Sequence, residues 1–132
     1  MSNPVKIKTS GVHHIAIRVS NFERSKAFYI DKLGFQTALE KPDLLIFFAG
    51  NTAIAIKGPE GKTAPGDQFN PFRVGLDHIA LGCENRGELE RVANALANHS
   101  IENTGIKLDE TLNKDYIAFK DPDRISWEFY MV

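Results

Sequence analysis

A short pattern occurs twice in this chain, and this repetition restricts the fold more than any other feature of the sequence. GVHHIAIRVSN, which begins at Gly11, aligns without gaps on GLDHIALGCEN, which begins at Gly75. Glycine, histidine, isoleucine, alanine, an aliphatic residue and asparagine recur in register. An internal repeat indicates one supersecondary unit that is used more than once. The chain is therefore predicted to fold from two similar halves.

Each copy begins with a predicted strand, which a predicted helix follows. The alternating apolar hexamers VHHIAI and LDHIAL are typical of strands. In the first copy, a helix over 22–33 ends before Gly34, and Ser20 with Glu23 forms a possible capping box. In the second copy, Asn85 offers the same kind of cap. The helix after it has a continuous apolar face, made of Leu89, Val92, Ala93, Leu96 and Ala97.

Short strand-like runs follow each helix, and a linker separates the two copies. The runs are 35–39, 44–49 and 52–56 in the first copy, and 116–119 and 125–131 in the second. Residues 58–74 are rich in glycine and proline and show no periodicity, which is typical of a linker. The predicted architecture is one α+β domain over residues 1–132, in which two βαβββ units, 11–57 and 75–132, flank that linker.

The composition excludes several classes of function. The chain has 132 residues, 42% of them hydrophobic, which is enough to bury a core without disulfides. Its net charge is −1 and no basic patch stands out, so nucleic acid is not an expected partner. Neither a signal peptide nor a run of roughly 18 apolar residues is present, so we expect no membrane partner and a cytoplasmic location. The single cysteine, Cys83, is predicted to be a small buried hydrophobe.

The repeated histidines lie on the side of each strand that a helix does not cover. Side chains alternate between the two faces of a strand, so His14 shares a face with Ala16 and Arg18, opposite the aliphatic residues. His78 has the same position in the second copy, beside Ala80. Both histidines are therefore predicted to point away from the core.

A carboxylate stands in the middle of the apolar last strand, SWEFYM. Burying Glu128 there is costly unless the carboxylate meets a cation or a hydrogen-bond donor. With His14 and His78 it makes a two-histidine, one-carboxylate set, which binds divalent iron, manganese or similar ions and leaves positions open for a substrate. These three residues are the predicted metal ligands. His13 and His99 are assigned to hydrogen-bonded structural positions in the core.

Three segments resemble the vicinal oxygen chelate superfamily, which includes glyoxalase I, the extradiol dioxygenases, methylmalonyl-CoA epimerase and the fosfomycin and bleomycin resistance proteins. They are HHIAIRVSNFERSKAFYIDKLGF, DHIAL and FKDPDRISWEF, and the resemblance covers nearly the whole chain. It implies that paired βαβββ units form a half-open β-barrel around a divalent metal ion, Fe²⁺, Mn²⁺, Ni²⁺ or Zn²⁺. Carried over to this sequence, the ligands are His14, His78 and Glu128.

Two positions depart from the pattern of that family. Glyoxalase I and the epimerase usually place a fourth ligand, Glu or Gln, on the last strand of the first unit, where this chain has Ala55. Alanine cannot coordinate a metal, which favours the three-ligand branches, namely extradiol-type dioxygenases and fosfomycin-type thiol transferases or hydrolases. Arg124 stands where the terminal turn often has glycine, and this changes only the geometry of the turn.

The resemblance implies an enzyme that binds a small substrate through two vicinal oxygens, extradiol-dioxygenase-like or of another three-ligand branch. Glu128 is assigned to catalysis as well as to metal binding, with Arg18 as a partner for an anionic substrate group and Tyr130 as a proton donor or as a hydrogen-bond partner of a metal ligand. A solvated arginine and a packed tyrosine would produce the same sequence pattern. The alternatives are a metal-free binding protein of the bleomycin resistance type, a fosfomycin-type thiol transferase and a scaffold with a structural metal. Because units of this superfamily can pair between chains, a swapped homodimer is expected.

Overall fold

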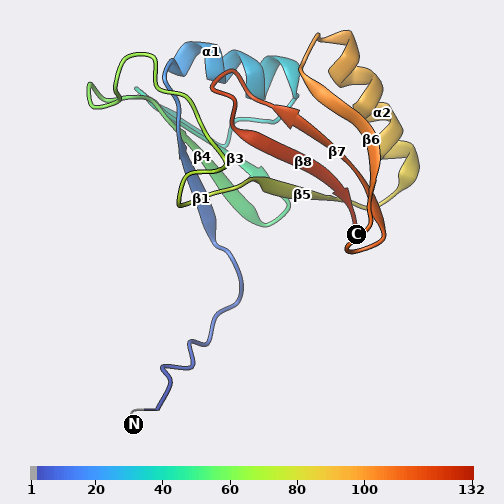
Figure 1. Ribbon diagram of the computed structural model, residues 1–132. Coiled ribbons are helices and arrows are strands. Elements are labelled where there is room, and N and C mark those ends of the chain that lie inside the picture. The colour runs from blue at the N-terminus through green and yellow to red at the C-terminus, as the bar shows by residue number, and fades with distance from the viewer. Residues whose placement is uncertain (1–2) are drawn as a thin grey trace.

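The computed structural model describes residues 3–132, which form two units of matching element order (Figure 1). The first unit contains β1 (His14–Arg18), α1 (Phe22–Lys26), the π-helical segment η1 (Ala27–Lys32), β2 (Leu39–Lys41), β3 (Leu44–Ala49) and β4 (Thr52–Lys57). The second unit contains β5 (Ile79–Cys83), α2 (Arg86–Asn98), β6 (Asn103–Asp109), β7 (Lys114–Lys120) and β8 (Ser126–Met131).

The two units have the same sheet topology. The strand orders are β1-β4-β3-β2 and β5-β8-β7-β6, and in each sheet the first strand of the unit runs parallel to the last. The registers also correspond, since Ala16 lies opposite Ala55 on β4 and Ala80 lies opposite Glu128 on β8. The predicted βαβββ repeat is confirmed, and the sheets remain two open, four-stranded sheets rather than a closed barrel.

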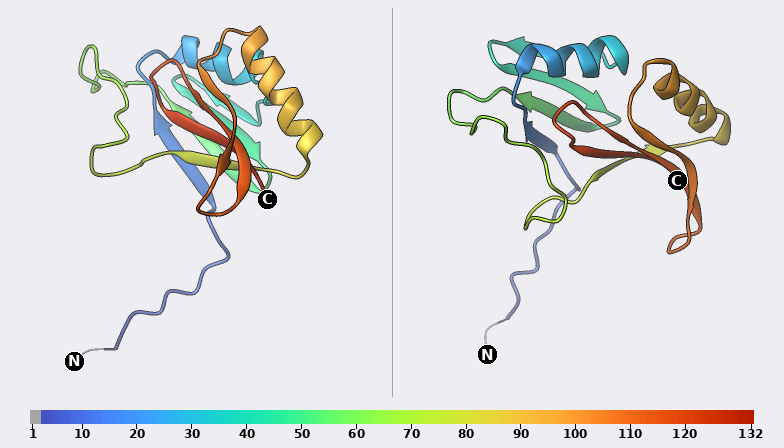
Figure 2. Two further views of the ribbon diagram at one scale, coloured as in Figure 1. Left: turned by 45° about the vertical axis from the view of Figure 1, so that its right-hand side comes forward. Right: turned by 45° about the horizontal axis from the view of Figure 1, so that its top comes forward.

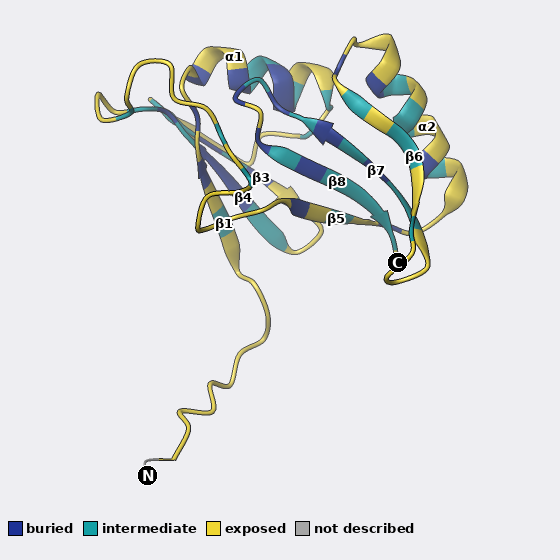
Figure 3. Cartoon of the chain, viewed as in Figure 1, coloured by how far each residue is buried: buried dark blue, intermediate teal, exposed yellow. Residues whose placement is uncertain are grey.

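One face of each sheet is buried and the other is open (Figure 3). Ile17 of β1 and Val19 just after it are buried on the helix side, while His14, Ala16 and Arg18 are exposed. The alternation predicted from the sequence is therefore confirmed. Burial of each large aliphatic side chain contributes about 1.5–3 kcal/mol to folding, so a shift of register by one residue would be strongly unfavourable. We call the exposed sides, which carry His14 in the first sheet and His78 in the second, the open faces.

The two units meet through their helix-covered sides, where η1 lies between them (Figure 2). Tyr29 of η1 is 1% exposed. Its ring stacks on Phe47 of β3 and makes an edge-to-face contact with Trp127 of β8, and both pairs of ring centroids are 5.7 Å apart. The Tyr29 hydroxyl donates to Asp121 Oδ2 at 2.8 Å and accepts from Trp127 Nε1 at 2.9 Å. Burial raises the pKa of Tyr29 well above its usual value. This contact leaves both open faces on the outside.

The cap of the first helix differs from the predicted one. Asn21, not Ser20, is the N-cap of α1, and its side chain accepts from the backbone N–H of Arg24 at 3.0 Å. Ser20 is held by the other unit, because its backbone N–H donates to the buried Asp123 at 3.0 Å and its hydroxyl also contacts that carboxylate. The cap predicted at Asn85 is confirmed, because the Asn85 side-chain oxygen accepts from the backbone N–H of Glu88 at 2.7 Å.

Two strands were not located correctly from the sequence. The strand predicted at 35–39 begins only at Leu39, because Phe35 packs on Phe47 with ring centroids 4.3 Å apart and is not part of the sheet. Strand β6 was not predicted, since Gly105 has a φ of 69° and the pairing register shifts after Asn103, which interrupts the alternation of side chains.

The single cysteine lies in the core of the protein. Cys83 is 1% exposed and belongs to the hydrophobic core, so the prediction of a small buried hydrophobe is confirmed. Its thiol donates to the carbonyl oxygen of Asn85 at 3.2 Å. Among residues 3–132, no helix has both the length and the apolar character that crossing a membrane requires.

Candidate metal centre

Two of the predicted ligands lie side by side on the open face of the second sheet. His78 directly precedes β5, Glu128 is central in β8, and these strands are neighbours. The Nε2 atom of His78 lies 3.4 Å from Oε1 of Glu128. Two donor atoms that each lie about 2.0–2.2 Å from one metal ion at tetrahedral or octahedral angles are separated by roughly 3 Å. The spacing in this chain therefore fits two ligands of a single ion.

A neighbouring carboxylate orients the imidazole of His78. Oδ1 of Asp77 lies 2.6 Å from His78 Nδ1. An ionised carboxylate can only accept, so Nδ1 carries the hydrogen and the lone pair of the neutral ring is on Nε2. That lone pair then faces the oxygen of Glu128, an arrangement that a cation or a shared proton between the two atoms would stabilise. Ligand histidines in metal sites commonly have such a carboxylate partner.

The environment of Glu128 is unfavourable for a free charge. Its side chain is 18% exposed on a strand that is otherwise rich in aromatic residues. Burial raises the pKa of Glu128, and the attraction of His78 opposes this effect. A half-buried carboxylate of this kind needs a positive partner, which the sequence also indicated.

The third predicted ligand lies elsewhere. His14 is exposed on the open face of the first sheet, with its Nδ1 2.9 Å from Nδ1 of His13. Within residues 3–132, no three His, Cys, Asp or Glu side chains are close enough together to hold a metal ion. The assignment of His13 and His99 to core positions is wrong, since both are exposed. One chain therefore brings together His78 and Glu128 but not His14.

The first sheet has no carboxylate at the position equivalent to Glu128. Ala55 lies opposite Ala16 as Glu128 lies opposite Ala80, so the two are related by the repeat. Ala55 is 9% exposed, and its methyl group cannot bind a metal. The structure thus confirms that an alanine stands at the first-unit position equivalent to Glu128.

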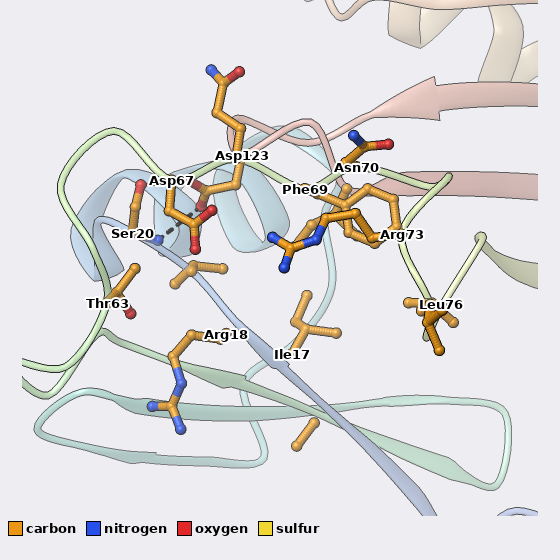
Figure 4. Close-up of a pocket in the computed structure, with 15 residues that line it drawn as sticks. Ile17, Arg18, Ser20, Thr63, Asp67, Phe69, Asn70, Arg73, Leu76 and Asp123 are labelled. Atoms are coloured by element: carbon orange, nitrogen blue, oxygen red, sulfur yellow. Dashed lines mark hydrogen bonds between the residues drawn. The ribbon is translucent and has the colours of Figure 1, made fainter.

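Arg18 lies beside a separate pocket of about 380 Å³, between β1 and the linker (Figure 4). Its guanidinium donates to the carbonyl oxygen of Gly58 at 2.6 Å and lies 3.6 Å from the Glu60 carboxylate. The linker contributes Asp67 and Arg73 to the same pocket. Arg18 is thus already engaged by its own chain.

Tyr130, two residues beyond Glu128, is held as a neutral phenol. Its hydroxyl donates to Asp109 Oδ2 at 2.7 Å, and its ring stacks on Tyr116 with centroids 5.8 Å apart. Burial and the neighbouring Asp109 carboxylate raise the pKa of Tyr130 to about 12. The hydroxyl shares the open face with Glu128, and its hydrogen already has an acceptor.

A second pocket, of about 310 Å³, includes His78 and Glu128 in its lining. Its lining also contains polar residues that were not predicted as site residues, among them Asp77, Glu102 and Lys120. Asp77 directly precedes a predicted ligand in LDHIAL, so its position in the sequence was a usable signal. Lys120 has no such signal, because its place depends on the pairing of β7 with β8.

Comparisons with known proteins identify the family of the chain. A family model described as the Glyoxalase/Bleomycin resistance protein/Dioxygenase superfamily matches residues 11–129. The uncharacterized protein YwkD of Bacillus subtilis (strain 168) is 34% identical, over 90% of this chain and 94% of that protein. Catechol-2,3-dioxygenase of the same organism is 29% identical, over 82% of this chain and 40% of its own length. A glyoxalase family protein from Enterococcus faecalis has a solved structure that is 28% identical, with a TM-score of 0.73 and coverage of 92% and 97%. The chain belongs to the glyoxalase, bleomycin resistance protein and dioxygenase superfamily.

Proposed function

We propose that this protein is a metal-dependent enzyme that acts on a small substrate bound through two vicinal oxygens. His14, His78 and Glu128 would hold one divalent ion, Fe²⁺, Mn²⁺, Ni²⁺ or Zn²⁺. The observation that supports this most directly is the 3.4 Å distance between His78 Nε2 and Glu128 Oε1, with Asp77 holding the other ring nitrogen. A histidine, a carboxylate and an orienting acid in one pocket form the donor set that a catalytic metal requires.

We further propose that His14 completes the site from a second copy of the chain. Within one chain the units meet through their helix-covered sides, so neither open face covers the other. The first open face also carries Phe48, which is 55% exposed, and Leu39, which is 41% exposed. A two-fold dimer in which this face covers the second open face of the partner would bury these side chains. It would also create two equivalent three-ligand sites.

The three-ligand set favours a dioxygenase-like reaction over isomerisation of the glyoxalase I type. Ala55 leaves the fourth protein position without a donor, so the ion would keep open positions for both substrate oxygens. A bound divalent ion would polarise those oxygens as a Lewis acid. Glu128 and His78 would orient it, and Tyr130 would present a neutral phenol beside them. The similarity to a catechol-2,3-dioxygenase supports this branch.

Two other functions of the same fold compete with this proposal. A metal-free binding protein has no need for an imidazole held by Asp77 and aimed at Glu128. A fosfomycin-type thiol transferase would use the same three ligands, so the metal site alone does not separate it from a dioxygenase. Arg18, which was the candidate for an anionic group, is engaged by Gly58 and Glu60, and this favours the dioxygenase.

Metal analysis of protein purified without chelator tests the proposal. We expect about one divalent ion per chain, and at least about a 100-fold loss of affinity in His14→Ala, His78→Ala and Glu128→Ala. His99→Ala is the matched control, because His99 is an exposed histidine at the end of α2 and should not change the metal content. Wild-type metal content in all three ligand variants would overturn the assignment. Assays with catechol in air, and with fosfomycin and a thiol, then separate the two enzyme classes.

A further inference from the structure

A lysine shares the pocket of His78 and Glu128, and the proposed metal site does not use it. Lys120 is half-buried near the end of β7 and lines this pocket. Its ammonium donates to the hydroxyl of Ser126 at 2.5 Å. Within residues 3–132, no carboxylate oxygen lies within 4.0 Å of this nitrogen. Since an ammonium has three hydrogens and Ser126 accepts one, two donors remain for another group.

The acidic residues near Lys120 have other partners. The backbone N–H of Lys120 donates to the carbonyl oxygen of Glu102, which brings the two residues together. The Glu102 carboxylate, however, is held by both terminal nitrogens of Arg124, at 3.1 and 3.2 Å. The next residue, Asp121, accepts from Tyr29 on the buried side of the sheet. Glu102 also lines the pocket, and Arg124 and, less strongly, Lys120 lower the pKa of its carboxyl group. Among residues 3–132, Lys120 thus lies near one acid that Arg124 already binds, and it forms no ion pair within 4.0 Å.

The pairing of β7 with β8 places Lys120 at a defined distance from the metal-binding pair. Ala118 lies opposite Glu128, and Lys120 lies opposite Ser126. Residues two apart on a strand point to the same face and are separated by about 6.6 Å. Because the side chain of Ala118 is small, it leaves space between Lys120 and Glu128 on this face of the sheet. The ammonium and the His78–Glu128 pair thus face one cavity from neighbouring positions.

We propose that Lys120 binds a carboxylate group of the substrate, at the end of the pocket away from the metal. The substrate class is then a small acid whose carboxylate and vicinal oxygens lie at opposite ends of the molecule, because two strand residues, about 6.6 Å apart along the backbone, separate the positions that face them. Identification of those oxygens as metal-bound rests on the proposed function. The contact of Lys120 with a carboxylate does not, since it needs no metal. Arg18, the residue that the sequence suggested for an anion, lies on the other sheet.

The first arm of the test uses metal-free protein and benzoate, a carboxylate without vicinal oxygens. Titration calorimetry should show that Lys120→Met weakens benzoate binding at least about tenfold, whereas Lys120→Arg, which keeps the charge, stays within a few fold of wild type. Lys107→Met is the control, because Lys107 is an exposed lysine of the same sheet that does not line the pocket. Equal binding by wild type and Lys120→Met, or no binding by wild type, would overturn the role of Lys120.

The second arm uses zinc-loaded protein with 4-methylcatechol and 3,4-dihydroxybenzoate, which differ by a methyl and a carboxylate group. Wild type should prefer the acid by at least about tenfold, and Lys120→Met should bind both equally while it keeps its affinity for 4-methylcatechol. If both compounds bind wild type equally, the carboxylate site is wrong and the metal site stands. If neither compound binds although the benzoate arm gives the expected result, the proposed metal function fails and the Lys120 site stands.

Discussion

The two βαβββ units share a topology and differ at the positions that would face a metal. In the second unit, His78 and Glu128 lie 3.4 Å apart and Asp77 orients the imidazole. In the first unit, the corresponding positions hold His14 and Ala55. The repeat has therefore kept the histidine in both halves and the carboxylate in only one. Under the proposed function, one chain would therefore offer two donors at one place, His78 and Glu128, and a third, His14, at another.

The units also contribute differently to the contact between them. The first unit supplies an aromatic side chain from η1, Tyr29, and the second supplies acids from the turn between β7 and β8. Asp121 accepts from Tyr29, and Asp123 accepts from Ser20 and Arg24. These buried and half-buried polar contacts hold the helix-covered sides together. They also fix the open faces in an outward orientation, which is the basis for expecting a second chain.

The largest expected effect of the difference at Ala55 is on reaction type. Wild-type protein loaded with nickel or zinc should isomerise the methylglyoxal and glutathione adduct no faster than the background rate, because the fourth ligand of the glyoxalase I pattern is missing. The measurement is the appearance of the thioester product by its ultraviolet absorbance, with a glyoxalase I as the positive control. Efficient turnover by the wild type would show that Ala55 does not discriminate between these branches.

The contact between the units should depend on pH through Asp121. Burial raises the pKa of Asp121 to about 6 in the folded protein, while an aspartate in an unfolded chain has a pKa of about 3.9. The folded state thus binds this proton more tightly. Its stabilising contribution is complete below about pH 4 and disappears as the pH rises to about 6, a change of about 3 kcal/mol in the free energy of unfolding.

The test compares urea unfolding of wild type and Asp121→Asn at pH 4, 5, 6 and 7, with chelator present. The asparagine does not titrate, so the stability of wild type relative to the variant should fall as the pH rises through this range. Glu110→Gln, at an exposed acid between β6 and β7, is the control for changes in surface charge. A stability difference that stays constant from pH 4 to pH 7 would contradict the proposed role of Asp121.

The smallest expected effect concerns the turns that correspond in the two units. Gly50 has a φ of 58° between β3 and β4, and Arg124 has a φ of 66° between β7 and β8. Arg124→Gly would relieve about 1–2 kcal/mol of left-handed strain. It would also lose an exposed ion pair with Glu102, of the kind that contributes little to stability, and raise the entropy of the unfolded chain.

Because these effects offset one another, the unfolding free energy of Arg124→Gly should differ from wild type by less than about 1 kcal/mol. Gly50→Ala is the matched comparison and should destabilise the protein by roughly 1 kcal/mol or more, since no ion pair compensates there. Thermal unfolding of both variants measures the difference. A loss of several kcal/mol in Arg124→Gly would mean that the ion pair with Glu102 is essential to the turn.

Features that depend on periodicity were predictable from the sequence. The repeat of HIA in both copies predicted the first strand of each unit and its two faces, because a strand places alternate side chains on opposite sides. The face on which His14 and Glu128 lie follows from that rule, but the difference in their exposure does not. Contacts that span the two units were not predictable. Ser20 and Asn21 are both suitable helix caps, and nothing in the local sequence indicates which of them contacts the other unit. Only the fold brings Asp123 to Ser20 and leaves Asn21 as the cap.

The pocket residues illustrate the same limit. Asp77 is next to a predicted ligand in the sequence, but its 2.6 Å contact with His78 depends on the path of the chain before β5. Lys120 is 42 residues from His78 (120 minus 78), and a strand register sets its position. β6 escaped prediction because a bulge at Gly105 disrupts its alternation. Long-range pairing and backbone irregularities carry no local signal in a single sequence.

The central claim is that the metal site is shared between two chains, and complementation tests it most directly. His14→Ala and Glu128→Ala chains would be mixed in equal amounts, unfolded and refolded together. In a swapped dimer, each mixed pair has one site with both lesions and one intact site, so about a quarter of wild-type metal binding should return. Native mass spectrometry would confirm that mixed dimers have formed. No recovery of metal binding in a sample that contains them would contradict the account, because every site would then carry a lesion from its own chain.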